Sequence, residues 1–158
     1  MRKYLFKGFL FLKIHSMSFA DCDTSQVELW GECYSLSATN ISLPNRSLTG
    51  PIPPEIGLFE NLINLKLKYN NLTGPIPPEI GNLSNLETLE LQFNNLSGPI
   101  PDGLWGLTNL RQLRLQKNQF TGNISPQIGD LTALTHLYLY GNQLTGSIPS
   151  EIGNLSNI

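Results

Sequence analysis

A pattern of apolar residues repeats every 24 positions from residue 38 to the end of the chain. In the unit 62–85 the apolar positions are Leu62, Leu65, Leu67, Leu72, Ile76, Ile80 and Leu83. The same frame recurs without insertion in units 38–61, 86–109, 110–133 and 134–157, and Ile158 stands at the first position of a sixth unit. One such unit cannot bury its own apolar side chains, so the repeat predicts a solenoid of stacked coils. We expect one elongated domain over 38–158, truncated at the start of the sixth unit.

Each unit from the second onward carries a Leu-x-Leu pair, at 65–67, 89–91, 113–115 and 137–139. Its period-2 alternation predicts one short strand per coil, and therefore a parallel sheet with strands about 4.8 Å apart. Further along the unit, Ile-Pro favours an extended segment and Pro-Glu-Ile-Gly a short 3₁₀-like turn. In the third unit Trp105 replaces the glycine of this turn. We expect the Trp105 side chain to face solvent.

An asparagine follows each of these four strands, at the point where the chain must turn inward: Asn70, Asn94, Asn118 and Asn142. A side-chain amide offers two donors and an acceptor, and so it can satisfy turn backbone groups that would otherwise be buried unpaired. We expect a structural ladder of asparagines through the stack. The first unit has Arg46 at this position.

The frame LxxLxLxxNxLTGxIPxxIGNLxN resembles the plant-type leucine-rich repeat, and the resemblance covers residues 38–158. It implies an α/β solenoid of right-handed coils, with a parallel β-sheet on the concave face and short 3₁₀ turns on the convex face. The family includes ectodomains of plant receptor kinases, polygalacturonase-inhibiting proteins and surface proteins of some bacteria. The resemblance therefore implies a protein or peptide partner, with a cell-wall polysaccharide or a secreted hydrolase as alternatives.

Two segments precede the repeats. Residues 1–20 begin with positive charge, continue with an apolar run and end in Ser18-Phe-Ala20, which is typical of a secretory signal peptide. The alternative is an upstream segment with a later start at Met17. Residues 21–37 lack the repeat frame, and we expect them to form an N-terminal cap over the first coil. Cys22 and Cys33 could close one disulfide there in an oxidising compartment.

The sequence of this cap departs from the Cys-x-Trp-x-Gly-Val-x-Cys pattern usual in the plant family. It looks more like the caps of leucine-rich-repeat proteins from environmental bacteria. The departure weakens the inference of a plant receptor.

Composition and residue content argue against several functions. A net charge of −2 with 14% charged residues does not fit a nucleic-acid binder. His136 is the only histidine after the leader, and with two cysteines it cannot complete a zinc site. The carboxylates Glu55, Glu79, Asp102 and Glu151 recur once per coil as a surface column. We expect no enzyme, no cofactor and no membrane contact except through a segment outside these residues.

The residues around each strand leucine face outward on the concave sheet and are the candidate partner-binding positions. The stacked charges Lys66, Glu90 and Arg114 alternate in sign and should attract one another across the strands. Tyr69 should lie over Phe93, and aromatic rings should cluster near the last coils. Exposed aromatics among polar neighbours are typical interface anchors. The predicted partner-binding residues are Lys66, Lys68, Tyr69, Glu90, Phe93, Arg114, His136, Tyr138 and Tyr140.

A less specific interpretation is that these rings simply cover one another on an inert sheet. Seven Asn-x-Ser/Thr sequons also occur, of which four arise from the repeat itself; the other three are Asn40, Asn45 and Asn123. We predict a secreted or cell-surface recognition module that binds a protein or peptide on its concave face. The alternatives are an inhibitor of a secreted hydrolase, of the polygalacturonase-inhibitor type, and a structural adhesin or spacer segment.

Overall fold

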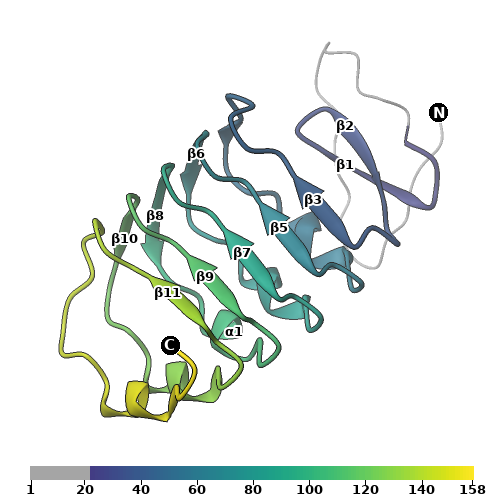
Figure 1. Cartoon of the computed structure of the whole chain (residues 1–158). Coiled ribbons are helices and arrows are strands. Elements are labelled where there is room, and N and C mark those ends of the chain that lie inside the picture. Colours follow the sequence, from purple (N-terminus) through teal and green to yellow (C-terminus); the bar gives the residue numbers. More distant parts are fainter. Residues whose placement is uncertain (1–21) are drawn as a thin grey trace.

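The computed structural model describes residues 22–158, so the predicted leader lies outside the described residues. The repeats form stacked coils that share one five-stranded parallel sheet (Figure 1). Its strands, in spatial order, are β3 Asn40–Ser42, β5 Asn64–Lys66, β7 Thr88–Glu90, β9 Gln112–Arg114 and β11 His136–Tyr138. Each strand pairs in register with its counterpart 24 residues away, so that Leu65 lies beside Leu89 and Leu89 beside Leu113. This confirms the predicted solenoid, with strands that begin one residue before the Leu-x-Leu pair.

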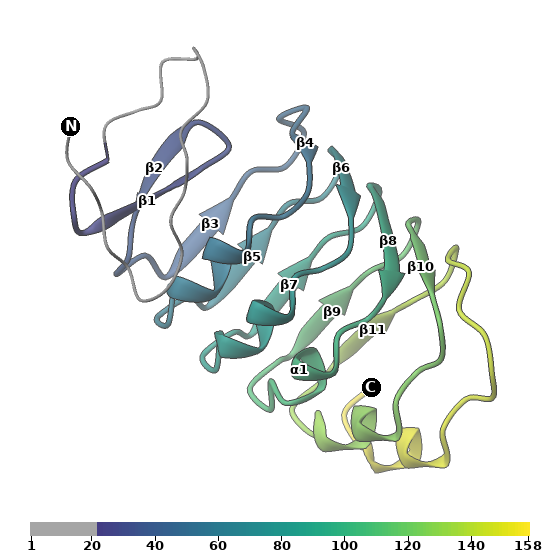
Figure 2. The same ribbon diagram turned by 180° about the vertical axis from the view of Figure 1, so that it is seen from behind.

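A second parallel sheet, which the sequence analysis did not predict, runs beside the first (Figure 2). It consists of β4 Thr49–Gly50, β6 Asn71–Gly74, β8 Asn95–Pro99 and β10 Gln119–Thr121, in that order. The strands β6, β8 and β10 directly follow the ladder asparagines Asn70, Asn94 and Asn118. In β6, Leu72 is buried in the stack, while Gly74 adopts a φ of +74° that L side chains rarely tolerate. Each coil is thus hydrogen-bonded to its neighbours along two sides.

Short turns close the coils on the side opposite the first sheet. Four are 3₁₀ turns, at η1 Pro54–Leu58, η2 Pro78–Asn82, η3 Pro126–Asp130 and η4 Ser150–Asn154. The third coil has instead a single α-helical turn, α1 Asp102–Trp105. A Cβ atom on Gly57 would lie 2.7 Å from the Glu79 carbonyl oxygen, and one on Gly81 would lie 2.9 Å from the Gly103 Cα. In three of the turns, the glycine, Gly57, Gly81 or Gly129, therefore allows the next turn to pack closely upon it.

Trp105 is buried, with 1% of its surface exposed, so the prediction that it faces solvent was wrong. Its position in the turn is the one at which Gly57 and Gly81 face the next coil. The turn α1 packs closely on η2 but only loosely on η3. This looser packing leaves room for a large buried side chain on that side of α1.

The core is one continuous stack of the repeat leucines and isoleucines, with Phe59 and Phe120 fully buried among them. At the N-terminal end an antiparallel hairpin covers the first coil. It is formed by β1 Gln26–Leu29 and β2 Glu32–Ser35. Leu29 is buried against the core, and Val27 and Tyr34 pack partly against it. The hairpin therefore covers apolar surface that the first coil would otherwise expose.

Candidate binding surface

The candidate surface is the outward side of the first sheet and the corner at which its strands end. Side chains alternate along each strand, so Leu65 and Leu89 point inward while residues 64 and 66, with their counterparts, point outward. Every predicted partner-binding residue lies on these strands or within three residues of their ends. The sheet thus brings together residues from four coils.

The charges on this surface pair differently from the prediction. Lys68 Nζ lies 2.8 Å from Glu90 Oε2, and the Glu90 side chain is 9% exposed. Lys66, Glu90 and Arg114 lie side by side on adjacent strands, as expected, but no salt bridge joins them within residues 22–158. Lys68 lies two residues beyond Lys66, and its stem reaches diagonally to the neighbouring coil. Because Glu90 is buried, loss of the Lys68 ammonium alone would leave a buried carboxylate without its partner, which is costly.

Tyr69 and Phe93 lie one above the other, as expected from their positions. Their ring centroids are 4.6 Å apart with planes inclined by 14°, and both rings are partly exposed. Both residues adopt the left-handed conformation, with φ of 57° and 58°, as does Lys117 in the next coil. This conformation costs a side-chain-bearing residue roughly 1 kcal/mol or more. In the last coil Gly141 occupies the same corner.

A second group of rings lies toward the C-terminal coils. The Arg114 guanidinium carbon lies 5.0 Å from the Tyr138 ring centroid, within cation–π range. Tyr138 meets Tyr140 edge to face at 6.5 Å and His136 at 6.3 Å. The structure thus gathers Arg114, His136, Tyr138 and Tyr140 into one patch. Arg114 contacts the Tyr138 ring and forms no salt bridge with Glu90.

Sequence analysis did not select three residues that belong to this surface. Gln92 and Gln116 are buried, and their Oε1 atoms accept no hydrogen bond within residues 22–158. Arg114 Nε likewise has no partner there. Lys117 Nζ lies 6.0 Å from the Tyr140 ring centroid. Only a comparison of equivalent positions in successive repeat units could have drawn attention to these residues, because glutamine and lysine are ordinary surface residues.

The asparagines hold the corner at which these side chains emerge. Asn94 Nδ2 donates to the Leu67 and Leu91 carbonyl oxygens, each at 3.0 Å, and its Oδ1 accepts from the Leu72 N–H at 3.0 Å. Asn118 makes the same three contacts one coil further on. Asn70 and Asn142 make equivalent bonds at the two ends of the row. Each amide therefore joins two adjacent coils.

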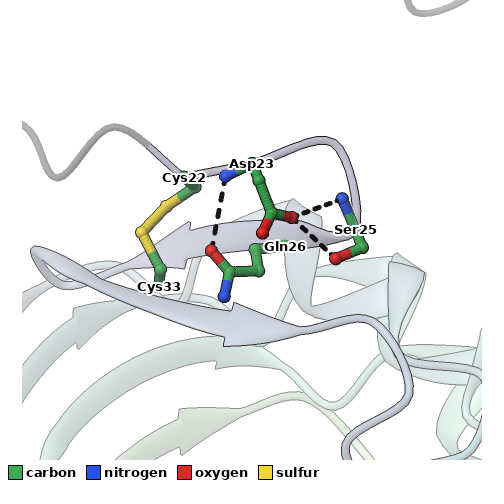
Figure 3. The surroundings of a disulfide bond; sticks show 5 residues. All are labelled: Cys22, Asp23, Ser25, Gln26 and Cys33. Carbon is green, nitrogen blue, oxygen red and sulfur yellow. Dashed lines mark hydrogen bonds between the residues drawn. A yellow bond between two sulfur atoms is a disulfide. The ribbon is translucent and has the colours of Figure 1, made fainter.

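The cap is held by covalent and polar contacts. Cys22 and Cys33 form a disulfide, and beside it the Asp23 carboxylate accepts from the Ser25 hydroxyl and N–H (Figure 3). These bonds lower the pKa of Asp23 below its usual range. Burial, together with the hydrogen bond that the Tyr34 hydroxyl donates to Glu32, raises the pKa of Tyr34 to about 12.

The cap is also linked to the first coil. Arg46 Nη2 donates to the Glu32 carboxylate at 3.1 Å, and the Arg46 backbone N–H donates to Asn70 Oδ1. The first coil thus has no ladder asparagine of its own, and its turn backbone is held by the second coil.

In the described part of the chain, no three histidine, cysteine or acidic side chains lie close enough together to hold a metal ion. Two shallow hollows lie away from the first sheet's outward side. One lies beside the starts of the strands and is lined by residues such as Thr39, Asn61 and Asn85. The other lies between the last two coils, beside Asn123 and Ile148. None of the helical turns in 22–158 has the length and hydropathy needed to cross a membrane.

Comparison with known families supports the repeat assignment. A leucine rich repeat profile matches residues 60–120, and a profile of two leucine rich repeats matches 108–157. The ectodomain of the receptor kinase SOBIR1 from Arabidopsis thaliana is similar, with a TM-score of 0.74 and 35% identity over 81% of this chain and 68% of that one. A search of curated proteins finds no match.

Two further solved structures similar to this chain contain bound partners. One is the ectodomain of the membrane receptor kinase GASSHO1/SCHENGEN3 from Arabidopsis thaliana in complex with CASPARIAN STRIP INTEGRITY FACTOR 2. It is 42% identical over 70% of this chain and 13% of that one, with a TM-score of 0.68. The other is the Arabidopsis receptor kinase HAESA in complex with the peptide hormone IDA and the co-receptor SERK1, at 38% identity over 73% and 20%, with a TM-score of 0.71. The chain thus spans between 13% and 20% of the length of these two relatives.

Proposed function

The chain belongs to the leucine-rich-repeat family, and on that premise we propose that it is an extracellular recognition module that binds an extended peptide or protein segment. The segment would lie across the outward side of the first sheet, between the Tyr69–Phe93 pair and the ring cluster around Tyr138. The similar receptor ectodomains with a bound peptide hormone support this choice of partner. No function as an enzyme is proposed.

The observation that carries the proposal is that three buried polar atoms of this surface, Gln92 Oε1, Gln116 Oε1 and Arg114 Nε, have no hydrogen-bond partner within residues 22–158. Leaving such an atom unpaired costs roughly 1–3 kcal/mol. An extended peptide offers backbone N–H groups at strand spacing, and these could pair with the glutamine oxygens after a rotation of the two side chains turns the buried oxygens outward. The exposed rings on either side would supply apolar anchors.

The direct test is peptide selection against the purified protein, with affinities then measured for selected peptides. Substituting Tyr69→Ala together with Phe93→Ala should weaken binding at least 30-fold, because stacked aromatic anchors are worth about 2 kcal/mol or more. A matched control pair on the far side, Asn82→Ala with Asp130→Ala, should leave affinity unchanged. Both residues of this control are exposed.

Circular dichroism must show that both double variants keep their fold. Equal affinity of the aromatic double variant and the parent protein would exclude this surface. If no peptide is selected but the immobilised protein binds a secreted hydrolase, the inhibitor alternative would be favoured.

An extracellular location is part of the proposal. The Cys22–Cys33 disulfide supports it, because such bonds persist in oxidising compartments. We expect residues 1–20 to direct export and to be removed after Ala20. Terminal sequencing of the exported protein should therefore begin at Asp21, and an exported chain that still begins at Met1 would contradict cleavage.

A further inference from the structure

The charged side chains of the chain are distributed unevenly over the fold. Residues 1–20 contain four of the ten lysines and arginines and no acidic residue, so the remainder carries six cations and twelve acids. Four of these six cations lie on the candidate surface, the outward side of the first sheet and its corner: Lys66, Lys68, Arg114 and Lys117. Of the acids in residues 22–158, only Glu90 lies there. The described part of the chain is therefore acidic as a whole but basic on this surface.

The single acid of this surface does not neutralise its charge. Glu90 Oε2 is already paired with Lys68 Nζ at 2.8 Å. The other three cations of the surface form no salt bridge within residues 22–158: Lys66, Arg114 and Lys117. By contrast, the two cations that lie elsewhere in this part of the chain, Arg46 and Arg111, each pair with a glutamate. The charges that lack an acidic partner are thus gathered on the candidate surface.

The three unpaired cations are spaced so that one extended segment could contact them. Lys66 and Arg114 lie in register on β5 and β9, on either side of β7, so their Cα atoms are about 10 Å apart. Lys117 lies at the corner that Tyr69 and Phe93 occupy in the two preceding coils. All three cations belong to the second and fourth coils, each of which has a neighbouring coil on both sides. In an extended chain, carboxylates two or three residues apart are separated by about 7–10 Å, which matches this spacing.

We propose that the segment bound by this surface is acidic, with two or more aspartate or glutamate side chains that pair with Lys66, Arg114 and Lys117. This inference rests on the proposed function and names the chemical class of its ligand. Carboxylates form charge-assisted hydrogen bonds with ammonium groups, and a guanidinium can bind one through two parallel bonds. The acids on the rest of the molecule repel such a segment, which directs its approach toward the basic surface.

The test begins with selection against the full chain from a peptide display library in which acidic and basic residues are equally frequent. We expect the retained peptides to contain about three times as many acidic as basic residues. For a retained acidic peptide, Lys66→Gln with Lys117→Gln should weaken binding about tenfold, because two ion pairs are lost. The matched control, Arg46→Gln with Arg111→Gln, removes the same charge from two exposed cations outside the surface and should change affinity less than about twofold. Glu90→Gln should strengthen binding about threefold, because it frees the Lys68 ammonium.

A retained pool without an excess of acidic residues would overturn this inference. If those peptides still depend on Tyr69 and Phe93, the proposed function stands. Equal losses of affinity in the two double variants would also overturn it, because the total charge of the protein, and not this surface, would then determine binding. An oligomer of galacturonic acid is measured in parallel. If it binds with the same dependence on Lys66 and Lys117 while no acidic peptide is retained, the ligand is an acidic polysaccharide and the peptide assignment is wrong. Retention of no peptide at all would count against the proposed function itself.

Discussion

Removing one rung of the asparagine ladder should destabilise the fold by an amount that depends on its place in the stack. In Asn94→Ala, the Leu72 N–H loses its only side-chain acceptor in a buried position, at a cost of roughly 1–3 kcal/mol. The Leu67 and Leu91 carbonyl oxygens each lose one donor but keep another, from Asn70 and Asn118. Each of these losses should cost about 0.5–1 kcal/mol. The expected total is about 3 kcal/mol.

Asn142→Ala should cost less, about 1–2 kcal/mol, because its hydrogen bonds are only partly buried and water can replace the amide. Urea unfolding followed by circular dichroism measures both values. An unchanged dependence of the unfolding free energy on urea concentration would show that the variants expose the same surface on unfolding as the parent protein. A loss below about 1 kcal/mol for Asn94→Ala, or equal losses at the two sites, would refute this account of the ladder.

A charge variant separates the donors from the acceptor. Asn94→Asp keeps an oxygen for the Leu72 N–H but turns a carboxylate toward the Leu67 and Leu91 carbonyl oxygens. At neutral pH it should therefore be less stable than Asn94→Ala, because an unpaired buried charge is costlier than a missing bond. Greater stability of the aspartate variant at neutral pH would show that the donors contribute little.

Three further results are expected. Replacing Cys22 and Cys33 by serine should lower the unfolding free energy by about 3 kcal/mol, since the bond closes a loop across a separation of 11 residues; no loss on chemical denaturation would contradict this. Trp105→Gly should cost about 3–5 kcal/mol by calorimetry and should remove a blue-shifted fluorescence component, whereas a red-shifted component would mean that the indole is wet. Folding favours the protonated Tyr34 phenol, whose pKa of about 12 exceeds the usual value of about 10, so its stabilisation is complete below about pH 10 and is lost as the pH rises toward 12. Alkaline unfolding of Tyr34→Phe should lack this loss, and identical profiles for the two proteins would contradict the assignment.

The apolar frame was sufficient to predict the coils, the first sheet and the turns, because a strict period leaves one way to bury every leucine at once. The second sheet was not predictable in the same way. In β6 a single buried residue, Leu72, stands among Asn71, Thr73 and Gly74, and no local alternation distinguishes this from a loop. Its hydrogen bonds come from neighbouring coils, so they exist only after the stack has formed.

The candidate surface could be predicted as columns of residues but not as contacts. The stacking of Tyr69 on Phe93 follows directly from the 24-residue period. The two residues hold equivalent positions in neighbouring coils, and their side chains leave the backbone at the same corner. Lys68 is long enough to reach Glu90 diagonally, and this choice between two lysines depends on side-chain conformation. The error at Trp105 had a similar origin, since Gly103, two residues earlier, provides the close approach on the other side of that coil.

The buried side chain of Trp105 bears on how sharply the stack of coils bends. A solenoid curves when its coils are spaced more widely on one rim than on the other, and hydrogen bonding fixes the spacing within the sheet at about 4.8 Å. Around Gly57, Gly81 and Gly129 the opposite rim is tightly closed, but between α1, which contains the buried Trp105, and η3 it is packed less closely. We therefore expect the stack to bend most tightly at this point, opposite which β7 and β9 present Glu90 and Arg114. In this way, a side chain buried among the turns affects the width of the concave surface that the first sheet forms on the opposite side.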